Sequence, residues 1–261
     1  MNLSREQVLR AEISHVEKML AETPDEFAIE RAGLQSRIVN LESELAKIDA
    51  SLNEARMDAN KSSHSARKLA RTDLAWPSLP SLDRYDSLET IGDAGLLSQH
   101  STGVFCSSKC PGSGILTATK WIANLADDET QTIAGGFHSA MEKSFLEILL
   151  GGRCRLIICP ARSLVRYRME DRFRQPMADQ RLVIASSLPE SVRSNSAASS
   201  LVRNRFAADL ATRIVFTYAA QGSRTEQFGL ELLGNGRTVH CLDTGCNTLL
   251  SAGAKLMSLE S

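Results

Sequence analysis

Two hydrophobic patterns divide the chain. In the first sixty residues, apolar side chains recur in alternating steps of three and four, which is typical of helices that pack along a narrow seam. The two seams are Leu9, Ile13, Val16 and Leu20, and then Leu34, Ile38, Leu41, Leu45, Ile48, Leu52 and Ala55. Between them, Thr23-Pro24-Asp25-Glu26 has the composition of a capping box with proline at the first helical position. We predict an antiparallel helical hairpin, or coiled coil, over residues 1–58.

The second predicted helix outreaches the first, so part of its seam lacks a partner within the hairpin. Self-association would cover that surface, and we expect a homodimer or higher homo-oligomer through these helices. The alternative is a hairpin packed on the chain's own main domain. Residues 1–60 contain 12 acidic and 7 basic residues, a net charge of −5. This charge is unsuited to nucleic acid, so the segment is interpreted as an assembly element.

From Val104 onward, short apolar runs alternate with amphipathic segments. The runs are residues 104–106, 131–134, 156–159, 182–185, 214–218 and 238–242, and helical spacing lies between them at 115–125, 140–150 and 225–233. Strands that are apolar along their whole length are typical of a parallel sheet covered by helices on both faces. We predict a doubly wound, mainly parallel, Rossmann-like α/β domain over residues 103–261, whose ligand binds beyond the carboxyl ends of the strands.

Residues 59–102 carry neither pattern. Pro77 and Pro80 would end any helix that entered this segment, and serines surround them. We predict a linker that wraps against the main domain, anchored by Trp76, Leu82 and Tyr85, with a short helix over residues 87–97.

Small and polar residues follow several of the predicted strands, where backbone amides at a helix start can bind an anion such as phosphate. The candidate binding residues in these loops are Ser107, Ser108, Lys109, Gly112, Gly135, Gly136, Phe137, His138, Arg162, Gly222, Ser223, Arg224 and Thr225. No loop has the spacing of a dinucleotide fingerprint or of a P-loop. The alternative is that each loop is only a tight strand-to-helix turn.

Charge supports an anionic ligand. Residues 151–224 contain 13 arginines, 5 acidic residues and no lysine, a net charge of +8. Arginine is suited to bidentate phosphate contacts. Solvation of a helix face is the alternative for Arg166, Arg168, Arg172 and Arg174, whereas Arg162, Arg203, Arg205 and Arg224 are expected in or near strand-end loops.

The segment from Arg203-Asn204-Arg205 to Ala211 resembles the R-N-R-x-x-A-x-L segment of the DNA-processing DprA (Smf) family, within the DprA/LOG-like (SLOG) group of Rossmann-like domains. The Gly222–Thr225 loop, Gly236–Val239 and Ser186–Pro189 resemble further family segments, and the resemblance covers about residues 103–256. Phe105–Gly112, Gly135–Lys143 and Ile158–Arg162 are similar to a poorly characterised branch of these proteins.

The resemblance implies binding of single-stranded DNA in DNA processing or recombination, with Arg203, Asn204 and Arg205 among the binding residues. Two loops depart from the family pattern. Ser107–Lys109 replaces a G-[ST]-R sequence, and Gly135–Ser139 replaces S-G-x-A-x-G-I-D. Two other functions remain open: a sensor of a nucleotide-derived signal in bacterial defence, and a nucleotide N-glycosidic hydrolase of the LOG type.

Composition limits the classes of protein to which this chain can belong. The sequence contains no apolar stretch long enough to span a bilayer, and charges stand where a signal peptide needs an apolar core. We therefore expect a cytoplasmic protein. Six cysteines occur without a C-x-x-C pair, which argues against a zinc site and a disulfide framework. We predict no cofactor, no metal and no catalytic residue, since no Ser-His-Asp pattern is present.

Overall fold

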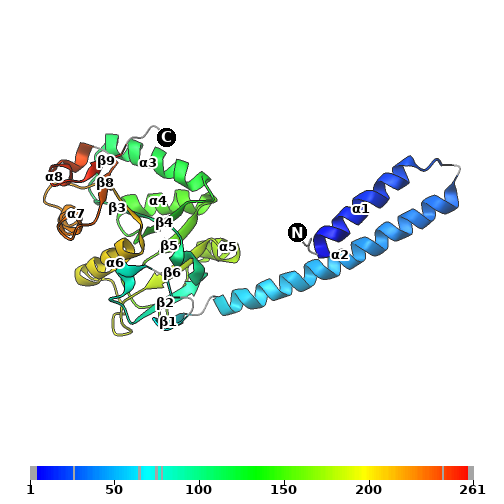
Figure 1. Ribbon diagram of the computed structural model, residues 1–261, viewed down its shortest axis with the longest axis horizontal. Coiled ribbons are helices and arrows are strands. Elements are labelled where there is room, and N and C mark those ends of the chain that lie inside the picture. Colours follow the sequence, from blue (N-terminus) through cyan, green and yellow to red (C-terminus); the bar gives the residue numbers. More distant parts are fainter. Residues whose placement is uncertain are drawn as a thin grey trace. The chain divides into compact units, whose positions relative to one another are not determined.

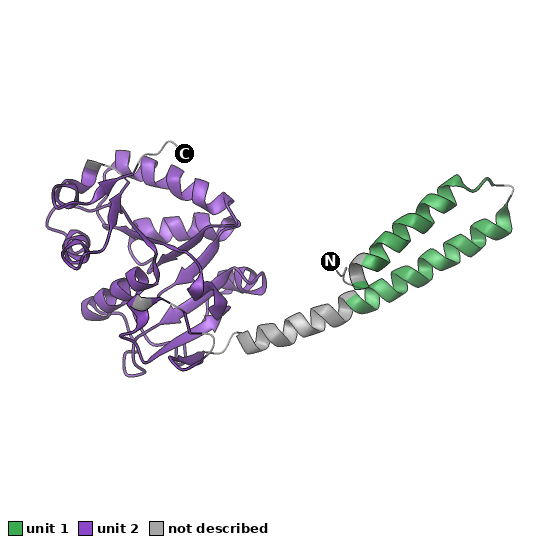
Figure 2. Ribbon diagram, viewed as in Figure 1, with its two compact units in different colours: residues 1–62 green, residues 63–261 purple. Residues whose placement is uncertain are grey.

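The computed structural model describes residues 5–25, 27–63, 66–73, 76–77, 79–242 and 244–257. The chain divides into two compact units, Met1–Ser62 and Ser63–Ser261 (Figures 1 and 2). No helix in the described ranges is long and apolar enough to cross a membrane.

The first unit is a helical hairpin of α1 (Arg5–Glu22) and α2 (Ala28–Ser63). Leu9 and Val16 of α1 are fully buried, as their seam positions require. The seam residues of α2, from Leu34 to Ile48, are only half-buried. Thr23 was predicted to cap the second helix, but α2 begins only at Ala28. The Thr23 hydroxyl instead donates to the Met19 carbonyl at the end of α1 (2.7 Å). Its expected capping partner, Glu26, lies outside the described residues.

The second unit is built on a nine-stranded sheet in the order β1-β2-β6-β5-β4-β3-β7-β8-β9 (Figure 1). Strands β3 to β9 are parallel to one another, and β2, between β6 and the edge strand β1, runs antiparallel to both of its neighbours. The strands are β1 (Arg67–Ala70), β2 (Ser87–Gly92), β3 (Thr102–Cys106), β4 (Thr132–Gly135), β5 (Arg155–Ile158), β6 (Leu182–Ser186), β7 (Arg213–Tyr218), β8 (Val239–Cys241) and β9 (Lys255–Leu256). The doubly wound, mainly parallel fold is confirmed, and all six predicted runs form strands.

Helices cover both faces of the sheet. Successive residues of a strand point to opposite faces, so each strand contributes apolar side chains to two cores. In β3, Val104 and Cys106 enter one core with residues of α3 (Gly112–Asp127), α4 (Ala140–Gly151) and α5 (Arg174–Ala178). Phe105 between them enters the other core, with residues of α6 (Ala197–Leu210), α7 (Arg224–Gly234) and α8 (Asn247–Ser251). Phe105 stacks there on Phe216 with ring centroids 5.3 Å apart.

The segment interpreted as a linker contributes to the sheet. Residues 67–70 and 87–92 form β1 and β2, and β2 pairs with β6. The helix expected over residues 87–97 is wrong: β2 occupies its first half, and a 3-10 helix, Ala94–Ser98, occupies its second. Over Ser87–Thr90 the residues alternate between half-buried and buried, as in a strand, and Ile91 is buried as well. Leu82 is buried, and Trp76 and Tyr85 pack against the core.

The chain changes direction across the sheet at β3. It proceeds from β3 to β4, β5 and β6 on one side, and then returns to place β7 on the other side of β3. The carboxyl ends of β3 and β7 therefore flank the topological switch point, where open α/β sheets bind their ligands.

Candidate functional site

The two loops at the switch point are held together by a serine pair. Ser107, after β3, is buried, and its Oγ lies 3.0 Å from the Oγ of Ser223, after β7. The Ser107 amide donates to the Tyr218 carbonyl (2.9 Å), and its Oγ accepts from the Ala220 amide (3.0 Å). Both serines were predicted to contact the ligand. Their hydrogen-bonding capacity is used to join the loops.

Two helix starts at this edge, those of α4 and α7, are capped by carboxylates of the chain itself. Glu142 of α4 accepts hydrogen bonds from the amides of Cys106 (3.2 Å), His138 (2.9 Å) and Ser139 (3.1 Å). Glu226 of α7 accepts from the Gly222 amide (2.7 Å). A carboxylate at a helix N-terminus satisfies the same amides that a phosphate would use. These loops therefore offer a ligand mainly their side chains.

A cavity of about 400 Å³ opens beside these loops. Its lining residues are Cys106, Ser108, His138, Ser139, Glu142, Asn195, Ser196, Ala197, Ser200, Arg203, Asn204, Arg224 and Thr225. Six of the sixteen predicted binding residues are among them: Ser108, His138, Arg203, Asn204, Arg224 and Thr225. The fold thus brings the loops after β3, β4 and β7 together with α6, although the sequence separates them widely.

Arg203 is the most deeply buried cation of this cavity. Only 5% of the residue is exposed. Its Nε donates to Asn204 Oδ1 (2.7 Å), and its Nη1 lies 3.5 Å from the Cys159 carbonyl. Within the described residues, no carboxylate lies within 4.0 Å of the guanidinium. Burial lowers the pKa of Arg203, with the negative charge of Glu142 acting in the opposite direction.

Gly136 makes room for that guanidinium. A Cβ atom built on Gly136 would lie closer than 3.0 Å to the Nε, Cζ and Nη1 atoms of Arg203. Glycine is thus required here by close approach, and its own contribution to binding is indirect. The neighbouring Phe137 adopts a positive φ of 47° and turns its ring into the core, so it is not a surface on which a base could stack.

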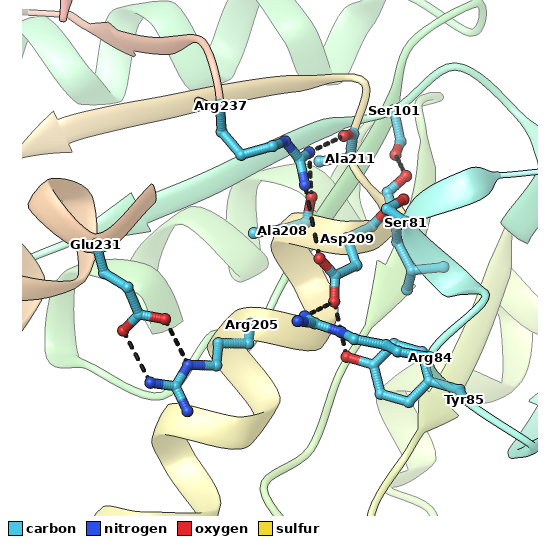
Figure 3. Close-up of polar contacts among 11 residues, drawn as sticks. Ser81, Arg84, Tyr85, Ser101, Arg205, Ala208, Asp209, Ala211, Glu231 and Arg237 are labelled. Carbon is cyan, nitrogen blue, oxygen red and sulfur yellow. Dashed lines mark hydrogen bonds and ion pairs between the residues drawn. The ribbon is translucent and has the colours of Figure 1, made fainter. Parts of the chain in front are cut away.

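Arg205 does not face this cavity, which corrects its predicted place. Arg203 and Arg205 both lie inside α6 and not in a strand-end loop. Arg205 donates to both carboxylate oxygens of Glu231 on α7 (2.6 and 2.9 Å). Figure 3 shows this pair beside a second cluster, in which Arg84, Tyr85 and Arg237 surround Asp209. The cluster fastens residues 81–85 to α6, and Arg205 belongs to this structural side of the helix.

The remaining predicted residues are not among those that line the cavity. Lys109 is exposed after β3, Gly112 is exposed at the first position of α3, and Gly135 is buried at the end of β4. Gly222 has a positive φ of 71° in the turn after β7. Arg162 follows β5, with its guanidinium carbon 5.8 Å from the centre of the Tyr167 ring. Its Nε is buried without a hydrogen-bond partner.

The 13 arginines of residues 151–224 fall into three groups. Four lie at the amino ends of strands: Arg153, Arg155, Arg181 and Arg213. Arg172, Arg174 and Arg205 are held in ion pairs. The other six are Arg162, Arg166, Arg168, Arg193, Arg203 and Arg224, which the described structure shows in no ion pair.

These six, the edge arginines, lie on loops or helices that follow the carboxyl ends of β5, β6 and β7. The loops after β5 and β6 meet directly, since the Ser163 amide donates to the Val192 carbonyl (2.8 Å). Six of the 13 arginines therefore follow strands at the edge where this fold binds ligands, and four lie at the amino ends of strands.

Sequence reasoning missed the contribution of the loop before α6. Asn195, Ser196 and Ser200 line the cavity. Ser196 caps α6, because its Oγ accepts from the Ser199 amide (3.0 Å). A Ser-x-x-Ser sequence at 196–199 was the available signal for this helix start. It would have placed Ser196, Ser200 and Arg203 on one helical face, at steps of four and three residues.

No metal site accompanies these residues in the part of the chain that the structure describes: no three His, Cys, Asp or Glu side chains converge there. The cysteine thiols are mostly buried, and burial raises the pKa of Cys106 and of Cys159 to about 12.

Solved structures with a similar fold are known. No family model and no curated protein matches the sequence. Among solved structures, DNA processing protein A (DprA) from Streptococcus pneumoniae is similar with a TM-score of 0.61 and 16% identity, over 98% of this chain and 95% of that one. DprA from Helicobacter pylori, whose structure is described for its single-stranded DNA binding mode, is similar with a TM-score of 0.58 and 18% identity, over 74% of this chain and 92% of that one. The chain has the fold of the DprA proteins.

Proposed function

We propose that the protein binds single-stranded DNA along the carboxyl edge of its sheet and acts in DNA processing or recombination. The observation that carries this proposal is the placement of the edge arginines. Six cations that form no ion pair with any described carboxylate follow strands at the edge where this fold binds ligands, on a chain whose net charge is −1. The two similar structures are DNA processing proteins, and one is described as binding single-stranded DNA.

The chemistry of the edge favours the phosphate backbone over the bases. Arginine binds phosphate through parallel N–H donors, and such contacts carry no sequence information. Among the described residues, Tyr167 is the one aromatic side chain that an edge arginine covers. We therefore expect weak sequence preference and an affinity that falls steeply as salt rises.

A salt titration with matched charge variants tests the proposal. The edge variant replaces Arg166, Arg168 and Arg193 by glutamine, and the control variant replaces Arg153, Arg155 and Arg213, which lie at the amino ends of strands. Both lose three positive charges, so a general charge effect would weaken binding equally. Fluorescence anisotropy of a labelled oligonucleotide gives the dissociation constant at each salt concentration.

We expect the edge variant alone to lose affinity and to show a smaller salt slope. Each lost phosphate contact reduces the slope of log K against log salt by about 0.7 for a single strand, so three contacts reduce it by about 2. Equal losses in both variants would disprove the edge as the binding surface. Absence of binding at low salt would disprove the function, and nucleotides would then be screened as ligands by thermal shift.

The hairpin is proposed as the assembly element of the same protein. Its α2 seam is only half-buried from Leu34 to Ile48, while Ile29 and Val39 are 90% and 62% exposed. A second hairpin would cover these side chains in a four-helix arrangement. Substituting lysine at both positions should lower the mass measured by light scattering, and an unchanged mass would contradict the assembly role of this face.

A further inference from the structure

We infer that the Arg203 cavity selects a terminal phosphate, that is, a phosphate monoester at the end of a strand or on a mononucleotide. The inference deepens the proposed function, because it assigns one end of the strand to one cavity. It rests on three features of the cavity: the burial of its arginine, its size and its supply of hydroxyl groups.

The burial of Arg203 restricts what can reach it. Because 95% of the residue is covered, a phosphate must enter the cavity to meet the guanidinium. A phosphodiester within a strand carries a sugar on each side, and both would have to follow the phosphate toward the buried guanidinium. A terminal phosphate carries a single sugar. The cavity volume of about 400 Å³ is in the range of pockets that hold one small ligand.

Arg203 forms no ion pair in the described structure, and the carboxylate that lines its cavity, Glu142, accepts instead from the amides of Cys106, His138 and Ser139. A buried charge is costly unless it is paired. Asn204 and the Cys159 carbonyl accept from two of its N–H groups and fix its orientation, but neither is charged. A phosphate monoester carries a charge of about −1.5 to −2 at neutral pH, compared with about −1 for a diester, so it compensates the cation more fully.

Other donors converge on the same space. Arg224, at the first position of α7, lines the cavity opposite α6 and is one of the edge arginines. Ser108, Ser200 and Thr225 add hydroxyl groups from three separate elements. A terminal phosphate has three oxygens to accept from such donors, whereas a diester has two unsubstituted ones.

The test compares strands that differ only at their ends. One oligonucleotide with an internal fluorophore is prepared with a 5′-phosphate, with a 3′-phosphate and with two hydroxyl ends. Anisotropy titrations use the full chain, Arg203→Lys and, as the matched control, Arg205→Lys. Lysine keeps the positive charge and loses the planar fork of donors. Thermal melting of each variant verifies that it is folded.

We expect either the 5′-phosphorylated or the 3′-phosphorylated strand to bind at least about tenfold more tightly than the strand with two hydroxyl ends. One good charged contact accounts for a difference of this size. Arg203→Lys should abolish this preference, and Arg205→Lys should retain it. Equal affinities for all three strands would overturn the inference and leave the proposed function standing.

Calorimetry with thymidine 5′-monophosphate distinguishes a failure of the proposed function from a failure of the terminal-phosphate site. If no strand binds but the mononucleotide binds and Arg203→Lys prevents it, the terminal-phosphate site is supported and the proposed function fails. If neither the strands nor the mononucleotide bind, both are overturned.

Discussion

Replacing Gly136 by alanine should empty the cavity of its buried cation without unfolding the protein. The new methyl group would occupy the position of the Arg203 guanidinium, closer than 3.0 Å to three of its atoms. Arg203 is the far end of a flexible side chain, so it can leave, whereas the Gly136 backbone at the end of β4 cannot shift as easily. The variant therefore removes the arginine from the cavity and keeps it in the sequence.

The magnitude follows from the contacts that Arg203 loses. Its hydrogen bond to Asn204 Oδ1 involves a charged donor and is worth about 1.5–3 kcal/mol. Rehydration of a buried cation offsets part of that loss. We expect the free energy of unfolding to change by no more than about 2 kcal/mol. Loss of a charged arginine contact to phosphate should weaken binding of a phosphorylated strand by about 10- to 100-fold.

Urea unfolding and anisotropy titrations measure these two effects on the same preparation. The control is Gly151→Ala at the end of α4, where nothing lies within 4 Å of the added methyl group. That substitution should leave binding unchanged and stabilise the helix by up to about 1 kcal/mol. A Gly136→Ala protein that binds the phosphorylated strand as tightly as the original would refute the role assigned to Arg203.

Three further predictions concern the support of the site. Tyr85→Phe removes the hydroxyl that donates to Asp209 (2.7 Å) and should cost about 1–3 kcal/mol in urea unfolding, while DNA affinity stays unchanged. Glu142→Gln leaves one oxygen to accept from the amides of Cys106, His138 and Ser139, and should lower the melting temperature; an unchanged melting temperature would contradict the capping role. Burial raises the pKa of Cys154 to about 11, so at pH 8 only about one in a thousand of these thiols is ionised. Mass spectrometry after alkylation should therefore find Cys154 labelled quickly in urea and slowly in the folded protein, and equal rates would contradict its burial.

The apolar pattern by itself determined the main architecture. Six runs such as 156–159 and 214–218 form strands, because a strand buried on both faces must be apolar along its length. The sequence analysis assigned the amides of the loops after β4 and β7 to a phosphate, whereas the carboxylates of Glu142 and Glu226 accept from them. The strand β2 was missed because its alternation is short and it pairs at an antiparallel edge that the parallel pattern does not predict.

Only the tertiary structure separated Arg203 from Arg205. The two residues are two positions apart on one helix, so their side chains point about 200° apart around its axis. One therefore enters the cavity beside Gly136, and the other meets Glu231 on α7. The sequence supplied the arginines and the strands that carry the loops. Which arginines face a ligand depends on which side of α6 packs against the domain and on where the carboxylates lie in the folded structure. Both are set by contacts between residues far apart in the chain.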